Sequence, residues 1–226
     1  MPVASPTPEP TYEPTMPVAS PTPEPTPEPT PEPTAEPNPE PVPPTDIGCM
    51  VVVIEAEDLA TGGGWTVVDD ERASGGKYIV WEGLSPGENN RDWRDGDIIT
   101  TTIDITAPGT YSFKWRMRQP SGVESDKGND SWLNFPDADR FGPEGGNASY
   151  GTFVKVYGRA LEGDFEYSGT AEEEDHDKEH SQIAIEFDEA REYVMEIAGR
   201  SHGHEIDQII LFGEVLSVDD AAAGCQ

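Results

Sequence analysis

The feature that most limits what this chain can fold into is the uneven spread of its prolines. Eighteen of the 23 prolines lie in residues 1–45, and only five are scattered over residues 46–226. The first segment also has seven Glu, no Lys, Arg or Gly, and a single aromatic residue, Tyr12. Such a composition cannot bury enough apolar surface to offset the entropy of the chain. The sequence therefore predicts a disordered Thr-Pro-Glu-rich linker over 1–45 and one folded domain over 46–226.

The linker is built from a repeated unit. Residues 1–15 and 16–30 are identical except that Tyr12 in the first copy corresponds to Pro27 in the second. Pro-rich segments favour extended polyproline II, and the repeated Glu side chains repel one another. Segments of this kind tether independently folded modules, so other modules of the same parent chain are expected partners. PxxP spacing is also compatible with docking to an SH3-like domain, and the sequence leaves this alternative open.

The net charge of −31 limits the partners of the protein. A chain so negative is repelled by nucleic acid and by anionic membrane surfaces, so neither is an expected partner. The longest apolar run, from Cys49 to Ile54, is far shorter than the roughly 20 residues that cross a bilayer. An acidic surface of this kind favours bound cations or a saline environment.

Residues 46–226 show the periodicity of strands. In 110–118 the apolar side chains of Tyr111, Phe113, Trp115 and Met117 alternate with polar ones, as on a half-buried strand. A Pro-Gly turn at 108–109 separates this segment from a second alternating one, 99–105. The other expected strands are Val51–Glu57, Trp65–Val68, Lys77–Trp81, Trp132–Phe135, Thr152–Tyr157, Ile183–Phe187, Tyr193–Ile197 and Ile206–Phe212. About ten short strands with Gly-rich turns predict an all-β fold, a β-sandwich.

The two cysteines, Cys49 and Cys225, flank the first and last expected strands. Chain termini of such domains tend to lie close together, so a disulfide between the two is plausible, and two free thiols are the alternative. A disulfide would indicate a secreted or extracellular protein.

Several polar patterns suggest metal binding or catalysis. Glu55 and Glu57 are two residues apart in an expected strand, so both carboxylates would leave one face, where Ca²⁺ could bind them or water could solvate them. A second acidic stretch, 126–139, fits no fixed calcium-loop spacing and is better explained as a polar loop.

The string His176-Asp177-Lys178-Glu179-His180 matches a zinc-peptidase pattern, but it lies in a segment without apolar residues, where no helix with a buried face can form. An enzyme is therefore not expected.

Four motifs follow one another in a recognisable order. They are Ile54-Glu55-Ala56-Glu57-Asp58, Ala73-Ser74-Gly75-Gly76-Lys77-Tyr78-Ile79, Pro108-Gly109-Thr110-Tyr111 and Ile206-Asp207-Gln208-Ile209. In this order the chain resembles the non-catalytic carbohydrate-binding modules of families six and thirty-five. The resemblance covers nearly all of residues 50–214. It implies a jelly-roll, galactose-binding-like β-sandwich that belongs to a secreted polysaccharide-degrading system.

The resemblance also implies a calcium site and a sugar site. The ligands of a structural Ca²⁺ would be Glu55, Glu57 and Asp207, with a carbonyl from the Ser74–Lys77 loop. Sugar binding uses aromatic faces with polar groups at their rim. The side chains expected to bind sugar are Trp81, Trp93, Asp130, Trp132, Asn134, Tyr167 and His204. The Asn that these modules carry before the final Asp is absent, because His204 and Glu205 stand there. The class of polysaccharide is therefore left open.

Two hypotheses about function result. The first is a non-enzymatic, calcium-stabilised module that holds an attached partner on a polysaccharide. The second is a calcium-dependent adhesion or structural β-sandwich that binds no sugar, which the missing Asn favours.

Overall fold

The structure is a computed structural model, and it describes residues 50–59, 61–84, 97–124, 127–145, 153–159, 163–171 and 181–224. The chain divides into two units, Met1–Pro43 and Pro44–Gln226, and every described residue belongs to the second. The linker, Cys49, Trp93 and Cys225 lie outside the described residues. Their assignments as tether, disulfide partners and sugar ligand stay predictions.

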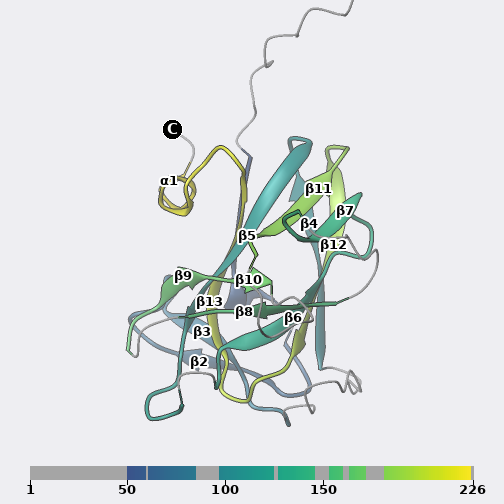
Figure 1. Ribbon diagram of the computed structural model, residues 1–226. Helices are drawn as coiled ribbons and strands as arrows, with labels where there is room; N and C mark the ends of the chain where they lie inside the picture. The colour runs from purple at the N-terminus through teal and green to yellow at the C-terminus, as the bar shows by residue number, and fades with distance from the viewer. Residues whose placement is uncertain are drawn as a thin grey trace, which may run out of the picture. The chain divides into compact units, whose positions relative to one another are not determined.

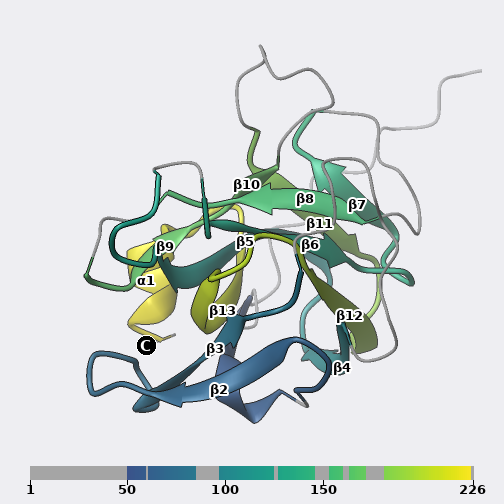
Figure 2. The same cartoon turned by 90° about the horizontal axis from the view of Figure 1, so that it is seen from below.

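The described residues form two antiparallel sheets (Figures 1 and 2). The eight-stranded sheet has the order β2-β3-β13-β5-β11-β7, with β1 paired to β13 and β9 paired to β5. Its strands are β1 (Val51–Glu55), β2 (Trp65–Asp69), β3 (Lys77–Trp81), β5 (Gly109–Arg118), β7 (Arg140–Pro143), β9 (Glu166–Ser168), β11 (Ile183–Phe187) and β13 (Glu205–Gly213). The five-stranded sheet has the order β10-β8-β6-β12-β4. Its strands are β4 (Ile98–Ile105), β6 (Asp130–Asn134), β8 (Val154–Tyr157), β10 (Thr170–Ala171) and β12 (Arg191–Gly199). The predicted β-sandwich is confirmed.

The core lies between the two sheets, and the alternation along β5 shows why. Tyr111, Phe113, Trp115 and Met117 are at most 1% exposed and belong to the main hydrophobic cluster. Burial of each such side chain contributes about 1.5–3 kcal/mol. The alternate residues, which include Arg116, point to the outer face of the eight-stranded sheet.

The helical segments are short. A single 3₁₀ turn, η1 (Ala56–Asp58), follows β1, and α1 (Val218–Ala222) begins after Ser217, whose side chain caps it by accepting from Asp220 N. In the described part of the chain, no helix has the length and apolar character needed to cross a membrane.

The first expected strand is shorter than predicted. The segment Val51–Glu57 was expected to be one strand, but the strand ends at Glu55, and η1 turns the chain so that Ala56 is fully buried. Glu55 and Glu57 therefore do not leave one strand face.

Candidate functional site

Three segments far apart in the sequence meet where β1 ends, β3 begins and β13 begins. Ser74 N, in the loop before β3, donates to Asp207 Oδ1 over 2.8 Å, and Ser74 Oγ donates to Glu55 Oε2. Glu55 is paired with Gln208 across β1 and β13, and Gln208 Nε2 donates to Glu55 Oε1 over 2.8 Å. The structure thus joins three of the four sequence motifs through side-chain hydrogen bonds.

Glu57 reaches the same cluster from η1. A Cβ added at Gly75 would lie 1.9 Å from Glu57 Oε1 and 3.6 Å from Glu55 Oε2, so the loop passes close to both carboxylates. Glu57 Oε2 is buried and has no hydrogen-bond partner. Burial raises the pKa of Glu57, and the negative charges of Glu55 and Asp207 raise it further. A backbone hydrogen bond at Glu57 opposes this increase in part, but Oε2 has no partner among the described residues.

A guanidinium group compensates part of the negative charge. Asp207 is fully buried, and its Oδ2 forms an ion pair with Arg116 Nη1 from β5. Burial raises the pKa of Asp207, while the hydrogen bonds from Ser74 and Arg116 oppose the increase. Tyr167, in β9, donates its hydroxyl to Gln208 Oε1 and so joins this cluster. The sequence predicts that Tyr167 stacks on a sugar, whereas this contact indicates that its hydroxyl holds Gln208 in place.

The residues offer the right chemistry for a hard cation, but they are not arranged as a complete ligand set. Ca²⁺ takes oxygen ligands, and Glu55, Glu57 and Asp207 supply six carboxylate oxygens. Among the described residues, however, no group of three or more His, Cys, Asp or Glu side chains is placed to hold a metal ion. One reason is that both oxygens of Asp207 already bind Ser74 and Arg116. Within the part of the chain that the structure describes, Glu57 Oε2 is the buried carboxylate oxygen of this cluster that has no hydrogen-bond partner.

A second network of charges lies beside the first on the outer face of the eight-stranded sheet. Arg118 donates from Nε to Glu205 Oε2 over 2.6 Å and from Nη1 to Asp70 Oδ2 over 2.7 Å. Its guanidinium lies 4.3 Å from the ring centroid of Phe165. Hydrogen bonds from Arg72, and then from Arg118, hold the pKa of Asp70 well below its usual range. Glu205, which stands beside the position of the missing Asn, thus serves to hold Arg118.

Three residues predicted to bind sugar lie on one face of β6. Asp130, Trp132 and Asn134 alternate with the buried core residue Leu133, so they face the outer side of the five-stranded sheet. They are nevertheless only 2%, 7% and 3% exposed. Asp130 forms an ion pair with Arg200 over 2.5 Å. Burial raises the pKa of Asp130, but the hydrogen bond and the charge of Arg200 lower it, and the net effect is a lowered pKa. The small exposed area of Trp132 does not support stacking, and its role in sugar binding stays a prediction.

Trp81 is part of the core. It is 2% exposed, and its ring lies against three glycines. A Cβ added at Gly64 would lie 2.7 Å from the ring, one at Gly83 2.2 Å, and one at Gly199 2.1 Å. Glycine is required at these positions because the indole fills the space that a side chain would need. The prediction that Trp81 stacks on a sugar is contradicted by this burial.

His204 is also inside the protein. It is 0% exposed, its Nδ1 lies 2.8 Å from Ser131 Oγ, and its ring meets the edge of Trp115 with a centroid separation of 4.9 Å. Burial lowers the pKa of His204 to about 4. A sugar at the surface cannot reach this ring, so its predicted role is contradicted. The same burial prevents Ser131 and His204 from acting as a nucleophile and base toward an external substrate.

Neither a protein-family model nor a curated protein matches the sequence. Solved structures do match. One is the Podospora anserina GH26-CBM35 β-(1,4)-mannanase, with 16% identity, a TM-score of 0.43, and coverage of 74% of this chain and 28% of that chain. Another is the carbohydrate binding module CBM6cm-2 from Cellvibrio mixtus lichenase 5A in complex with cellotriose, with 14% identity, a TM-score of 0.43, and coverage of 73% and 97%. A third is the C-terminal CBM6 of LamC from Zobellia galactanivorans, with 13% identity, a TM-score of 0.43, and coverage of 72% and 98%.

Families six and thirty-five, which the sequence motifs resemble, both occur among these structures. The chain spans less than a third of the mannanase and nearly the whole length of the two modules. Likeness at this identity and TM-score does not carry a function over to the chain.

Arg116 and Arg118 organise the outer face of the eight-stranded sheet through acidic partners that the sequence does not reveal. Arg116 and Arg118 were visible as the polar positions of β5, but the spacing alone gave no acidic partner for either. The partners are Asp207 for Arg116, and Asp70 and Glu205 for Arg118, and only the pairing of β13 with β5 brings the β13 residues beside β5.

Proposed function

We propose that this chain is a non-catalytic carbohydrate-binding module that is stabilised by calcium and holds an attached partner on a polysaccharide. The observation that carries the proposal is the meeting of three of the motifs at Ser74, which bonds to both Glu55 and Asp207. These are the segments on which the resemblance to carbohydrate-binding modules rests. A sequence that matched them by chance would have no reason to bring them into contact.

The linker gives the module its mode of action. A tether over 1–45 raises the effective concentration of an attached partner at the glycan without any new chemistry. The partners are then a polysaccharide and the other modules of the parent chain, in a secreted or extracellular setting. The charge of −31 argues against nucleic acid and anionic membranes.

Calcium would be held by Glu55, Glu57 and Asp207, with a carbonyl from the Ser74–Lys77 loop. The support for it is Glu57 Oε2, which is buried without a partner, and the raised pKa of that carboxyl group. A divalent cation would supply the missing positive charge at this end of the sandwich.

Retention in native gels cast with polysaccharides tests sugar binding. We expect the full chain to be retarded by at least one neutral β-glucan, mannan or galactan relative to a gel without polysaccharide. Calcium and chelator lanes separate a structural role of the metal from a direct one. Absence of retardation on every polysaccharide would contradict the proposal.

Thermal unfolding with calcium and with chelator tests the metal site. Calcium should raise the Tm of the wild-type protein, and Glu57→Gln should remove this increase, because the amide lacks the charge that binds the cation. In chelator the same variant should unfold at the wild-type temperature or above it, since it loses the repulsion from Glu55 and Asp207. Glu71→Gln, on an exposed turn, is the matched control and should keep the full calcium response. An unchanged calcium response in Glu57→Gln would exclude this site.

The alternative is a calcium-dependent adhesion or structural β-sandwich without sugar binding. The burial of Trp81, Trp132 and His204 favours it. A calcium-dependent increase in Tm without retention on any polysaccharide would select this alternative.

A further inference from the structure

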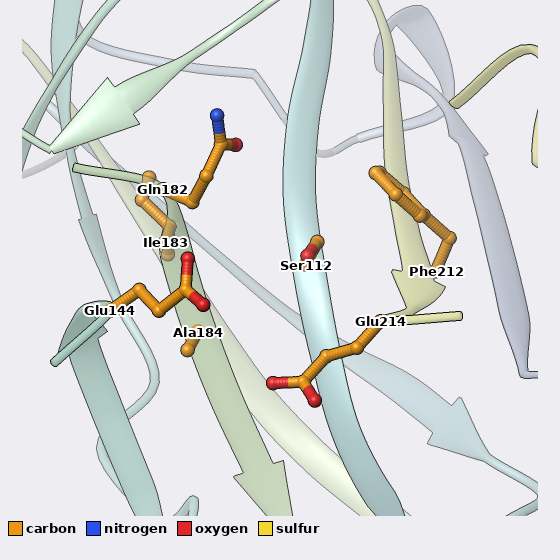
Figure 3. Close-up of a pocket in the computed structure, with 7 residues that line it drawn as sticks. All are labelled: Ser112, Glu144, Gln182, Ile183, Ala184, Phe212 and Glu214. Atoms are coloured by element: carbon orange, nitrogen blue, oxygen red, sulfur yellow. The ribbon is translucent and has the colours of Figure 1, made fainter. Parts of the chain in front are cut away.

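A hollow of about 460 Å³ lies on the outer face of the eight-stranded sheet, over the ends of β5 and β13 (Figure 3). Its volume falls in the range of about 300–1,000 Å³ that is typical of small-ligand sites. The residues around it are Ser112, Glu144, Gln182, Ile183, Ala184, Phe212 and Glu214. None of them belongs to the residues that the sequence suggested for sugar or metal binding.

The floor of the hollow is a row of small residues across neighbouring strands. Gly142 of β7 is paired with Ala184 of β11, and Ala184 is paired with Ser112 of β5. This row of small residues ends at β13, where Ser112 is paired with the larger Phe212. Because three successive strands carry almost no side-chain bulk here, a flat ring can lie close to the sheet.

Polar groups stand on both sides of this floor. In Figure 3 the carboxylates of Glu144 and Glu214 extend from opposite sides toward Ala184 and Ser112. Gln182 Oε1 accepts from Lys114 Nζ over 2.7 Å, so the amide nitrogen of Gln182 is the group left to donate. The rim thus offers carboxylate acceptors for hydroxyl groups and an amide donor.

The charges around the hollow are close to balanced. Lys114 and Arg140 lie in the flanking rows of the sheet together with Glu144, Glu186 and Glu214. Among the described residues around the hollow, the two cations therefore offset most of the charge of the three carboxylates. The two carboxylates at the rim disfavour an anionic ligand, and two carboxylates alone make an incomplete site for a divalent cation.

We infer that this hollow binds a neutral saccharide unit of the polysaccharide. The inference rests on the proposed function and names the place where the sugar is held. It is compatible with the burial of Trp81 and Trp132, because neither side chain lines the hollow in which the sugar would lie.

Titration calorimetry of the full chain with cellohexaose, laminarihexaose and mannohexaose tests the inference. Ala184→Phe places a ring on the floor and should weaken binding at least tenfold. Glu214→Gln, which keeps the shape of the side chain, should weaken it several-fold. Val215→Phe adds the same ring at a neighbouring position that is 82% exposed, and it should bind as the wild type does. Tm values of all the variants verify folding.

Each outcome separates the two proposals. If the wild type binds an oligosaccharide and both Ala184→Phe and Glu214→Gln bind it equally well, the hollow is not the site, while the carbohydrate-binding function stands. If the wild type binds none of the three hexaoses, this inference is overturned, while the proposed function falls only if native gels also show no retention on any polysaccharide. If Ala184→Phe fails to fold, Glu214→Gln alone decides, together with amide NMR shifts at Gly142, Ser112 and Ala184 in the wild type. Shifts at these amides with calcium chloride alone and none with the sugars would overturn the inference in favour of a cation.

Discussion

The buried histidine should make the stability of this protein depend strongly on pH. The unfolded chain protonates His204 near its ordinary pKa of 6.5, whereas the folded protein holds it neutral down to a pKa of about 4. Above pH 6.5 both states are neutral, and His204 contributes no pH dependence. As the pH falls from 6.5 to 4, only the unfolded state takes up the proton, so the free energy of unfolding decreases.

The size of this effect follows from the two pKa values. A separation of two and a half pH units at about 1.4 kcal/mol each gives a full loss of about 3.5 kcal/mol below pH 4, of which about 3 kcal/mol is reached at pH 4. This is a large part of the roughly 5–15 kcal/mol by which most domains are stable. A nearby carboxylate, Asp130, opposes the lowering of the pKa of His204 but is outweighed by burial.

His204→Asn is the perturbation that isolates the effect. Asn cannot titrate, yet it keeps a polar atom near Ser131 Oγ, the present partner of His204 Nδ1. Urea unfolding between pH 7.5 and 4, in chelator, should show the wild type losing about 3 kcal/mol more than the variant. The carboxyl groups titrate in both proteins, so their contributions cancel in the difference. Ser131→Ala, which keeps the imidazole, should follow the wild-type pH dependence.

Parallel curves for the wild type and His204→Asn would refute the reasoning. NMR titration of the His204 ring in the wild type provides a second measurement that needs no variant. A pKa near 6 in the folded protein would show that the imidazole is solvated, in disagreement with its burial.

Two further substitutions test the packing and the charge network. Arg118→Met leaves Asp70 and Glu205 without their shared partner and should lower the free energy of unfolding by about 3–5 kcal/mol, or the Tm by about 10 °C. Arg72→Met is the control: the side chain of Arg72 is 54% exposed, so its loss should change stability little. Equal effects of the two would contradict the burial of Arg118. Gly199→Ala places a Cβ 2.1 Å from the ring of Trp81. It should lower the free energy of unfolding by about 1–3 kcal/mol and shift the tryptophan fluorescence. Unchanged fluorescence and stability would mean that the ring is not confined.

The fold could be predicted from the sequence because its long strands have one buried and one solvated face. The alternation in 110–118 gave both the strand and its inward side chains, and β5 has that arrangement. Three strands were missed: β7, β9 and β10 have four, three and two residues, too few for alternation to stand out. The end of β1 was misplaced because an alternating acidic pattern is equally compatible with a 3₁₀ turn.

The candidate site was predictable only in part. The expectation that Glu55, Glu57 and Asp207 lie near one loop agrees with the contacts around Ser74 and Gly75. The burial of three expected sugar residues, Trp81, Trp132 and His204, could not be predicted, for another reason. Periodicity tells which face of a strand a residue is on, but it does not tell what covers that face, and Trp132 is outward-facing and still buried.

The pairing of β1 with β13 has a mechanical consequence. Met50 and Gly213 are joined by a backbone hydrogen bond of 2.8 Å, so the chain enters and leaves this ladder at the same end. Tension between these two residues would act across the hydrogen bonds and load them one after another, from Val51 and Phe212 toward Glu55 and Gln208. The strands would peel apart at low force, as a zipper opens, and the cluster around Ser74 would be the last part to yield.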